Sequence, residues 1–219
     1  MSKLLSEFVP IPDQSEIWSA QKGSLRCTAL RLRDGSLCLY SPVLGLGDCA
    51  KSSLSKLGEV SHLLAPNHYH NKGLSEYSEA FPAAKLICSD RARPRLTKQT
   101  GLSFADLQTV EPILPNGCKL AEPDGLKTGE TWLIVDTTSE RIWIVCDSFK
   151  GPNGTVGHVG EQVEMLGTFA TYAIKDAEAY TAWIKAKIDG AAPSMILPCH
   201  GAAVRSENLA VDILSLLDR

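Results

Sequence analysis

The stretch VSHLLAPNHYH, residues 60–70, joins a short apolar segment to a cluster of polar residues. The apolar part closes on Pro66, which predicts a buried strand that ends there. The polar part places His68 and His70 directly after this strand. Because side chains at a strand end are held by a rigid sheet, the stretch predicts one wall of a functional cleft.

Two later apolar segments end in the same way. RIWIVC, residues 141–146, is followed by Asp147, and SMILPC, residues 194–199, is followed by His200. Each segment predicts a buried strand that delivers a carboxylate or an imidazole just before a turn. We therefore expect one cleft to gather four side chains: His68, His70, Asp147 and His200.

These four side chains suit a metal ion. His68 and His70, at i and i+2, project to the same side of an extended segment, which places both near one ion. Asp147 adds an oxygen ligand and His200 a further nitrogen. Three histidines and one carboxylate favour zinc, with iron and manganese also open. The alternative stays open that the histidines are a surface pair, Asp147 caps a loop and His200 is a hydrogen-bonded core residue.

Turn signals and apolar patterns extend this interpretation along the chain. Asp34-Gly35 and Ser139-Glu140 each separate two strand-like segments and predict hairpins. Further strands are predicted at 84–90 and 109–114, and helices at 51–57, 74–81, 175–190 and 206–219. Two similar β-rich halves, each with its own helices, predict one α/β domain over residues 1–219, built as a four-layer αββα sandwich.

A doubly wound parallel sheet is the competing fold. GLGDCA, residues 45–50, matches a loose dinucleotide-binding pattern, in which Gly45 and Gly47 would approach a nucleotide. No acidic residue follows in clear register at the end of a second parallel strand. The two hairpin signals also weigh against a purely parallel sheet, so the sandwich is favoured.

Composition excludes several classes of protein. Apolar residues make up 44% of the 219 residues and charged residues 21%, which is ordinary for a folded globular chain. A net charge of −3 and the lack of a long apolar run argue against nucleic-acid and membrane partners. Seven cysteines without a CxxC motif, and an N-terminus unlike a signal peptide, predict a cytoplasmic protein with reduced thiols. We expect a small-molecule substrate, with monomer and homodimer both open.

From Leu25 to its C-terminus, the chain resembles the metallo-β-lactamase fold superfamily, whose order of elements in an αββα sandwich is the one described above. The first histidine motif of that superfamily is H-x-H-x-D-H. Here His68 and His70 match it, while Lys72 stands in place of the aspartate and Gly73 in place of the last histidine. A divergent branch of the superfamily carries Ser-Pro after the early hairpin, and Ser41-Pro42 of this chain matches that pair.

The later ligand positions of the superfamily are matched in part. Leu126 stands where a third histidine precedes a turn, Asp147 matches the bridging aspartate, and His200 matches the last metal histidine. The resemblance therefore implies at most one metal ion, because the ligands of a second ion are replaced. Lys72 would also repel a second divalent cation.

The resemblance implies a mononuclear hydrolase that cleaves a small ester, thioester or amide. In that reaction Asp147 would hold the attacking water and accept its proton, and Lys72 would stabilise the developing oxyanion. The alternative is a metal-free, degenerate member of the superfamily that acts as a ligand-binding or interaction protein.

Overall fold

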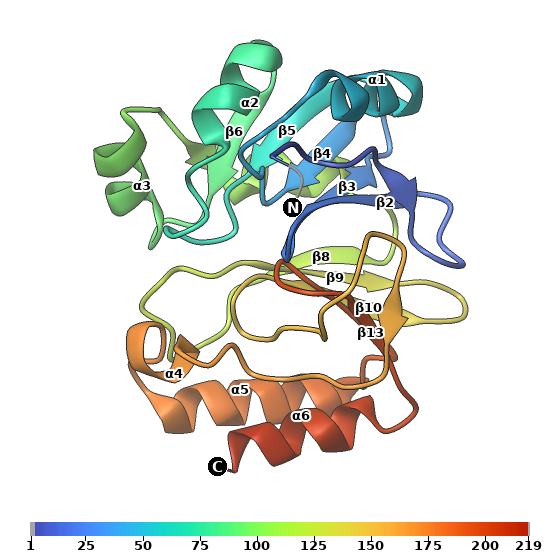
Figure 1. The fold of residues 1–219 in the computed structure, drawn as a ribbon. Helices are drawn as coiled ribbons and strands as arrows, with labels where there is room; N and C mark the ends of the chain where they lie inside the picture. Colours follow the sequence, from blue (N-terminus) through green and yellow to red (C-terminus); the bar gives the residue numbers. More distant parts are fainter. Residues whose placement is uncertain (1–2, 219) are drawn as a thin grey trace.

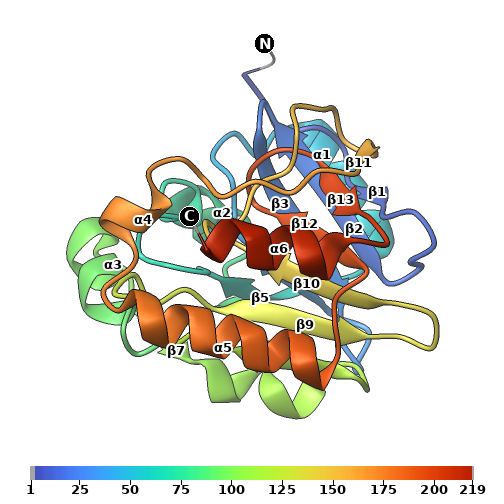
Figure 2. The ribbon, with the colours of Figure 1, turned by 90° about the horizontal axis from the view of Figure 1, so that it is seen from below.

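Two β-sheets lie face to face and carry helices on their outer faces, in a computed structural model that describes residues 3–218 (Figure 1). The predicted domain and its last predicted helix extend to residue 219; residues 1, 2 and 219 lie outside the described part. Helices α1, α2 and α3 pack on the first sheet, and α4, α5 and α6 pack on the second. Figure 2 shows α5 and α6 running across the second sheet. This is the four-layer αββα arrangement that the sequence predicted.

The first sheet is antiparallel at one side and parallel at the other. In spatial order it contains β1 (Val9–Pro10), β2 (Ile17–Lys22), β3 (Leu25–Arg31), β4 (Leu37–Tyr40), β5 (Val60–Leu64), β6 (Lys85–Cys88) and β7 (Ala105–Asp106). From β4 onward each pair is parallel, so each connection must cross over. The crossovers are α1 (Asp48–Leu57), α2 (Leu74–Ala80) and α3 (Arg93–Thr100).

The second sheet mixes both kinds of pairing. In spatial order it contains β11 (Val159–Gly160), β13 (Ala203–Arg205), β12 (Met195–Pro198), β10 (Arg141–Val145), β9 (Trp132–Asp136) and β8 (Cys118–Ala121). Its helices are α4 (Phe169–Tyr172), α5 (Ala177–Gly190) and α6 (Leu209–Leu217). No helix among residues 3–218 has both the length and the apolar character of a membrane span.

The central strands are buried on both faces, as a sandwich with outer helices requires, whereas the strands at the sheet edges are partly exposed. In β10, Ile142 and Ile144 point into the apolar layer between the sheets, whereas Trp143 and Val145 point toward the helices. This period-2 alternation is why the central strands read as continuous apolar runs in the sequence.

The predicted hairpins are confirmed, and two other expectations are wrong. Asp34-Gly35 joins β3 to β4, and Ser139-Glu140 joins β9 to β10. Residues 109–114 were expected to form a strand but fall in two short 3₁₀ helices, where Pro112 has no N–H for a sheet ladder. The doubly wound alternative is wrong because two sheets with antiparallel pairs face each other. The Gly45 N–H, which a nucleotide phosphate would need, donates to the Glu76 carboxylate at 2.6 Å.

Gly73 precedes α2 where the chain passes under the segment that follows β4. A Cβ atom at this position would lie 2.4 Å from the Pro42 carbonyl oxygen and 2.8 Å from the Leu44 nitrogen. Both neighbours are backbone atoms, so they cannot yield by rotating a side chain. Only glycine fits without a shift of the main chain.

Replacing Gly73 by alanine should therefore lower the free energy of unfolding by about 1–3 kcal/mol, the usual cost of overpacking. Denaturant unfolding of Gly73→Ala and of the wild type measures this difference. Gly167→Ala is the matched control, because no atom lies within 4 Å of its added Cβ, and it should change stability by less than about 0.5 kcal/mol. Equal stability of Gly73→Ala and the wild type would contradict the close approach.

Candidate metal centre

Three strand ends from two sheets meet at one edge of the sandwich. His70 follows β5 of the first sheet, while Asp147 and His200 directly follow Cys146 and Cys199, beyond β10 and β12 of the second. His70 Nε2 lies 2.9 Å from Asp147 Oδ1, and His200 Nε2 lies 3.0 Å from the same oxygen. The two Nε2 atoms are 3.3 Å apart. One carboxylate oxygen and two imidazole nitrogens thus form a compact triangle.

The triangle has the dimensions of a set of metal ligands. Bonds of about 2.0–2.1 Å at tetrahedral angles place the ligand atoms of a zinc ion about 3.3 Å apart. The observed separations of 2.9, 3.0 and 3.3 Å are within a few tenths of an ångström of that value. The donor set, two imidazoles and one carboxylate, also suits zinc. The residues present therefore fit one divalent ion.

His68 does not join this triangle, contrary to the sequence expectation. Its Nε2 accepts a hydrogen bond from Arg95 Nη1 at 3.2 Å, and its ring packs edge-on against Tyr69. Burial, reinforced by the Arg95 charge, lowers the pKa of His68 to about 4, so the ring is neutral.

His68 points away from the triangle because of the local backbone conformation. The Asn67 side-chain oxygen accepts the N–H groups of Tyr69 and His70, at 2.8 and 3.2 Å, and bends residues 67–69 into a turn. The assumption of an extended segment was wrong, so i and i+2 do not share a side.

Lys72 is exposed and lines the same cavity as His70, Asp147 and His200. Within residues 3–218, Asp147 forms ion pairs with the two histidines and not with Lys72. Lys72 therefore does not occupy a second ion's place beside Asp147. Its predicted role toward an oxyanion stays a prediction.

Two residues that orient the triangle were not assigned these contacts from the sequence. Asn67 Nδ2 donates to Asp147 Oδ2 at 2.8 Å, and Ser41 Oγ lies 2.8 Å from His70 Nδ1. The contact with Ser41 leaves His70 Nε2 to face Asp147. Ser41 has a φ of 59°, a left-handed conformation that is costly for serine and that concentrates at functional sites.

The buried Glu130 carboxylate holds the loop that carries Asp147. It is 1% exposed and accepts the backbone N–H groups of Cys146, Asp147 and Ser148, at 3.1, 3.2 and 3.3 Å. It also accepts Trp132 Nε1–H at 2.8 Å. Burial first, and then the Asp147 charge, raise the pKa of Glu130 to about 7. A single glutamate before a strand carries no sequence signal for such a role.

Hydrogen bonding dominates the electrostatics of the triangle. Burial alone would raise the pKa of the Asp147 carboxyl, but hydrogen bonds from His200 and His70 outweigh it and hold that pKa far below its usual value. Burial alone would lower the pKa of His70, but its interactions with Asp147 and Cys199 raise it well above the usual value. A metal ion must therefore displace a proton that the histidines and the carboxylate share.

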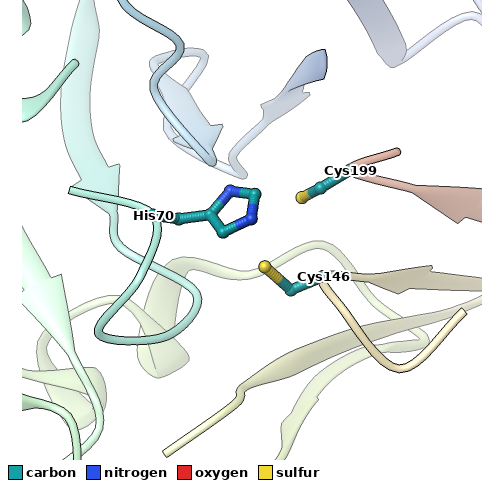
Figure 3. A group of neighbouring side chains, drawn as sticks. All are labelled: His70, Cys146 and Cys199. Carbon is teal, nitrogen blue, oxygen red and sulfur yellow. The ribbon is translucent and has the colours of Figure 1, made fainter. Parts of the chain in front are cut away.

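Two thiols lie beside the triangle, on its buried side. Cys146 and Cys199 are free, buried cysteines, and His70 faces both sulfur atoms (Figure 3). One ligand atom from each of these three residues lies within 4.8 Å of the other two. Burial would raise the pKa of the Cys199 thiol, but interactions with Cys146 and His70 lower it to about 5. The sequence placed both cysteines in buried segments but did not bring them together.

A cavity of about 660 Å³ opens onto the triangle. Its walls are mostly apolar and include Leu25, Val43, Leu44 and Leu166, with Tyr69 and Tyr172 as aromatic surfaces. Leu25, Leu44 and Tyr69 are among the large hydrophobic side chains that stay exposed. Cavities of this size that combine apolar walls with a few convergent polar groups bind small molecules.

Comparison with known proteins tests the fold. No protein-family model matches the chain, and no curated protein matches it either. A metallo-β-lactamase from Pontibacter korlensis is similar in structure, with a TM-score of 0.61 and 12% identity over 97% of this chain and 100% of that one. DIM-1 metallo-β-lactamase exposed to ceftazidime gives a TM-score of 0.65 and 10% identity over 98% of both chains.

FIM-1 metallo-β-lactamase from Pseudomonas aeruginosa, in its mono-zinc form, gives a TM-score of 0.65 and 12% identity over 97% of this chain and 95% of that one. Each similarity extends over nearly the full length of both chains, at an identity that carries no information about activity. The chain therefore has the metallo-β-lactamase fold, as the motifs at its strand ends predicted.

Proposed function

We propose that the protein is a mononuclear, metal-dependent hydrolase that cleaves a small apolar ester, thioester or amide. The observation that carries this proposal is the triangle of His70, Asp147 and His200, whose ligand atoms are spaced as around one ion. The fold, which is similar to that of FIM-1 in a mono-zinc form, is compatible with one ion at this edge.

We infer one ion and not two because three residues of this chain stand at ligand positions of the superfamily and cannot bind a metal. Gly73 stands at a histidine position, but any side chain there would collide with the backbone of Pro42 and Leu44. Leu126, at another histidine position, is 2% exposed and packs in the apolar layer under α5. Lys72 replaces a carboxylate by a cation. These three substitutions leave a second divalent ion without ligands.

Each residue at the edge of the cavity would have a separate role in hydrolysis. His70, His200 and Asp147 would hold zinc, which, when bound, polarises a carbonyl group and makes water more acidic. Asp147 Oδ2, oriented by Asn67, is the atom to which a proton from water would pass. The Lys72 ammonium group would stabilise negative charge on the carbonyl oxygen. The apolar walls of the cavity would bind the acyl part of the substrate and exclude water.

Zinc binding tests the ligand set. Protein purified without chelator, or loaded with zinc and dialysed, should hold one zinc per chain. Asp147→Asn and His200→Ala should each weaken zinc binding by more than about 100-fold, beyond the cost of losing a residue that only orients a ligand. His68→Ala is the matched control, because its ring faces Arg95, and it should keep the zinc. Metal content by atomic emission and competition with a zinc chelator measure these differences; equal loss in all three variants would contradict the assignment.

Lys72 can be tested separately from the metal. Lys72→Met should reduce the hydrolysis of chromogenic aryl esters or acyl thioesters at least about 10-fold, mainly through kcat, and leave the zinc content unchanged. Lys98→Met, on the exposed surface of α3, is the control and should keep full activity. If Lys72→Met and the wild type hydrolyse these substrates equally well, Lys72 does not stabilise the oxyanion.

A metal-free binding protein is the second candidate. It is favoured by the hydrogen bonds that already satisfy His70, Asp147 and His200 among themselves, and by the loss of three ligand positions of the superfamily. A wild type that takes up no zinc, iron or manganese and hydrolyses no ester or thioester would favour this candidate over the hydrolase.

A further inference from the structure

Two buried thiols and one imidazole form a second set of potential ligands next to the triangle. We propose that His70, Cys146 and Cys199 bind a soft, monovalent copper ion at an inner position, distinct from the outer position that uses Asp147 and His200. Figure 3 shows the His70 ring facing both sulfur atoms from one side, and each cysteine directly follows a strand of the second sheet.

The pairing of the strands sets the positions of the thiols. β10 and β12 are parallel neighbours with Val145 opposite Pro198, so the next residues, Cys146 and Cys199, also lie side by side. His70 approaches from the first sheet. One ligand atom of each residue lies within 4.8 Å of the other two, and a three-coordinate ion with bonds of about 2.0–2.3 Å needs about 3.5–4 Å. Shifts of less than about 1 Å would therefore complete the set.

The ligand types select the ion. Thiolate sulfur is a soft ligand that favours Cu(I). Cu(I) is stable with two or three protein ligands, whereas zinc with three protein ligands takes a water molecule as its fourth. The inner set offers two sulfurs and one nitrogen. Cys146 and Cys199 are 0% and 2% exposed, so the position is dry, which disfavours hydrated, oxygen-seeking ions such as magnesium.

A buried cation, Arg26, lies next to the thiols and favours their ionised form, which is the form that binds a metal ion. Arg26 is 1% exposed and donates to neutral oxygens: Ser19 Oγ at 2.7 Å, the Pro198 carbonyl at 3.2 Å and the Gly201 carbonyl at 3.0 Å. Within residues 3–218, no carboxylate forms an ion pair with it. A buried charge is normally compensated.

The Arg26 guanidinium interacts electrostatically with Cys199, and its backbone N–H donates to the Cys199 carbonyl at 2.9 Å. Cu(I) and Arg26 would each oppose the charge of the two thiolates. Asp147 and Glu130 add negative charge beside Cys146, so the charge balance does not select the ion, and the choice of Cu(I) rests on the softness of the sulfur ligands.

Because His70 belongs to both sets, the two positions compete. Cu(I) at the inner position should lower the affinity of the outer position for zinc, and zinc should lower the affinity for Cu(I) by the same factor. Only this competition rests on the proposed hydrolase function. Binding of Cu(I) by itself does not require the outer site to hold a metal.

The test is a titration of the reduced protein with Cu(I) under anaerobic conditions, against a chromogenic Cu(I) chelator. The wild type should bind one Cu(I) per chain. Cys146→Ser and Cys199→Ser should each weaken binding at least about 100-fold, whereas Asp147→Asn should bind within about 3-fold of the wild type. Cys49→Ser, at an exposed cysteine, is the matched control and should bind like the wild type. Retention of Cu(I) by the two inner variants would overturn the proposal.

X-ray absorption of the copper-loaded wild type covers the case in which a serine variant does not fold. Two sulfur ligands and one nitrogen ligand are expected; one sulfur, or none, would overturn the inner site. Zinc separates the two proposals. If the wild type binds Cu(I) but no zinc, the hydrolase proposal is contradicted and the inner site is supported. If it binds zinc but no Cu(I), the inner site is contradicted and the outer metal site is supported.

Discussion

The site depends on the hydrogen bonds that one buried carboxylate, that of Asp147, makes to residues of both sheets. Asp147 is 2% exposed, and a buried charge is stable only with partners. It finds them across the layer boundary: His70 and Asn67 come from the first sheet, and His200 from the second. The two sheets are therefore joined by hydrogen bonds where the cavity opens, and these contacts hold the four side chains in place.

Two further buried charges stiffen the strand ends themselves. Glu130 accepts the N–H groups that follow β10, and Arg26 donates to the carbonyl groups of Pro198, the last residue of β12, and of Gly201 in the turn that follows. Backbone groups at these bends have no partners within the sheet, so a charged side chain of opposite polarity satisfies each bend. Asp147 and His200 sit directly on these two bends. Their positions thus depend on side chains that never face the cavity.

Two residues, Gly73 and Leu126, limit what this edge of the sandwich can bind. Where the superfamily motif has a histidine, close backbone contact around Gly73 leaves no room for any side chain, and Leu126 turns another histidine position into apolar core. Two thiols and the buried Arg26, which has no carboxylate partner within residues 3–218, lie on the inner side of the triangle. We propose that this edge holds one divalent ion at an outer position, with a softer set of ligands beneath it.

Local patterns in the sequence determined the central strands, most of the helices, the hairpins at Asp34-Gly35 and Ser139-Glu140, and the three polar strand ends, because alternation and turn chemistry act between near neighbours. They could not determine which histidine faces the cleft. The Asn67 turn redirects His68 toward Arg95, in another element, and leaves His70 at the site. The pairing of Cys146 with Cys199 likewise depends on strand register across more than 50 residues. Such long-range contacts decide in which direction a side chain points after a strand, so this direction is known only from the tertiary structure.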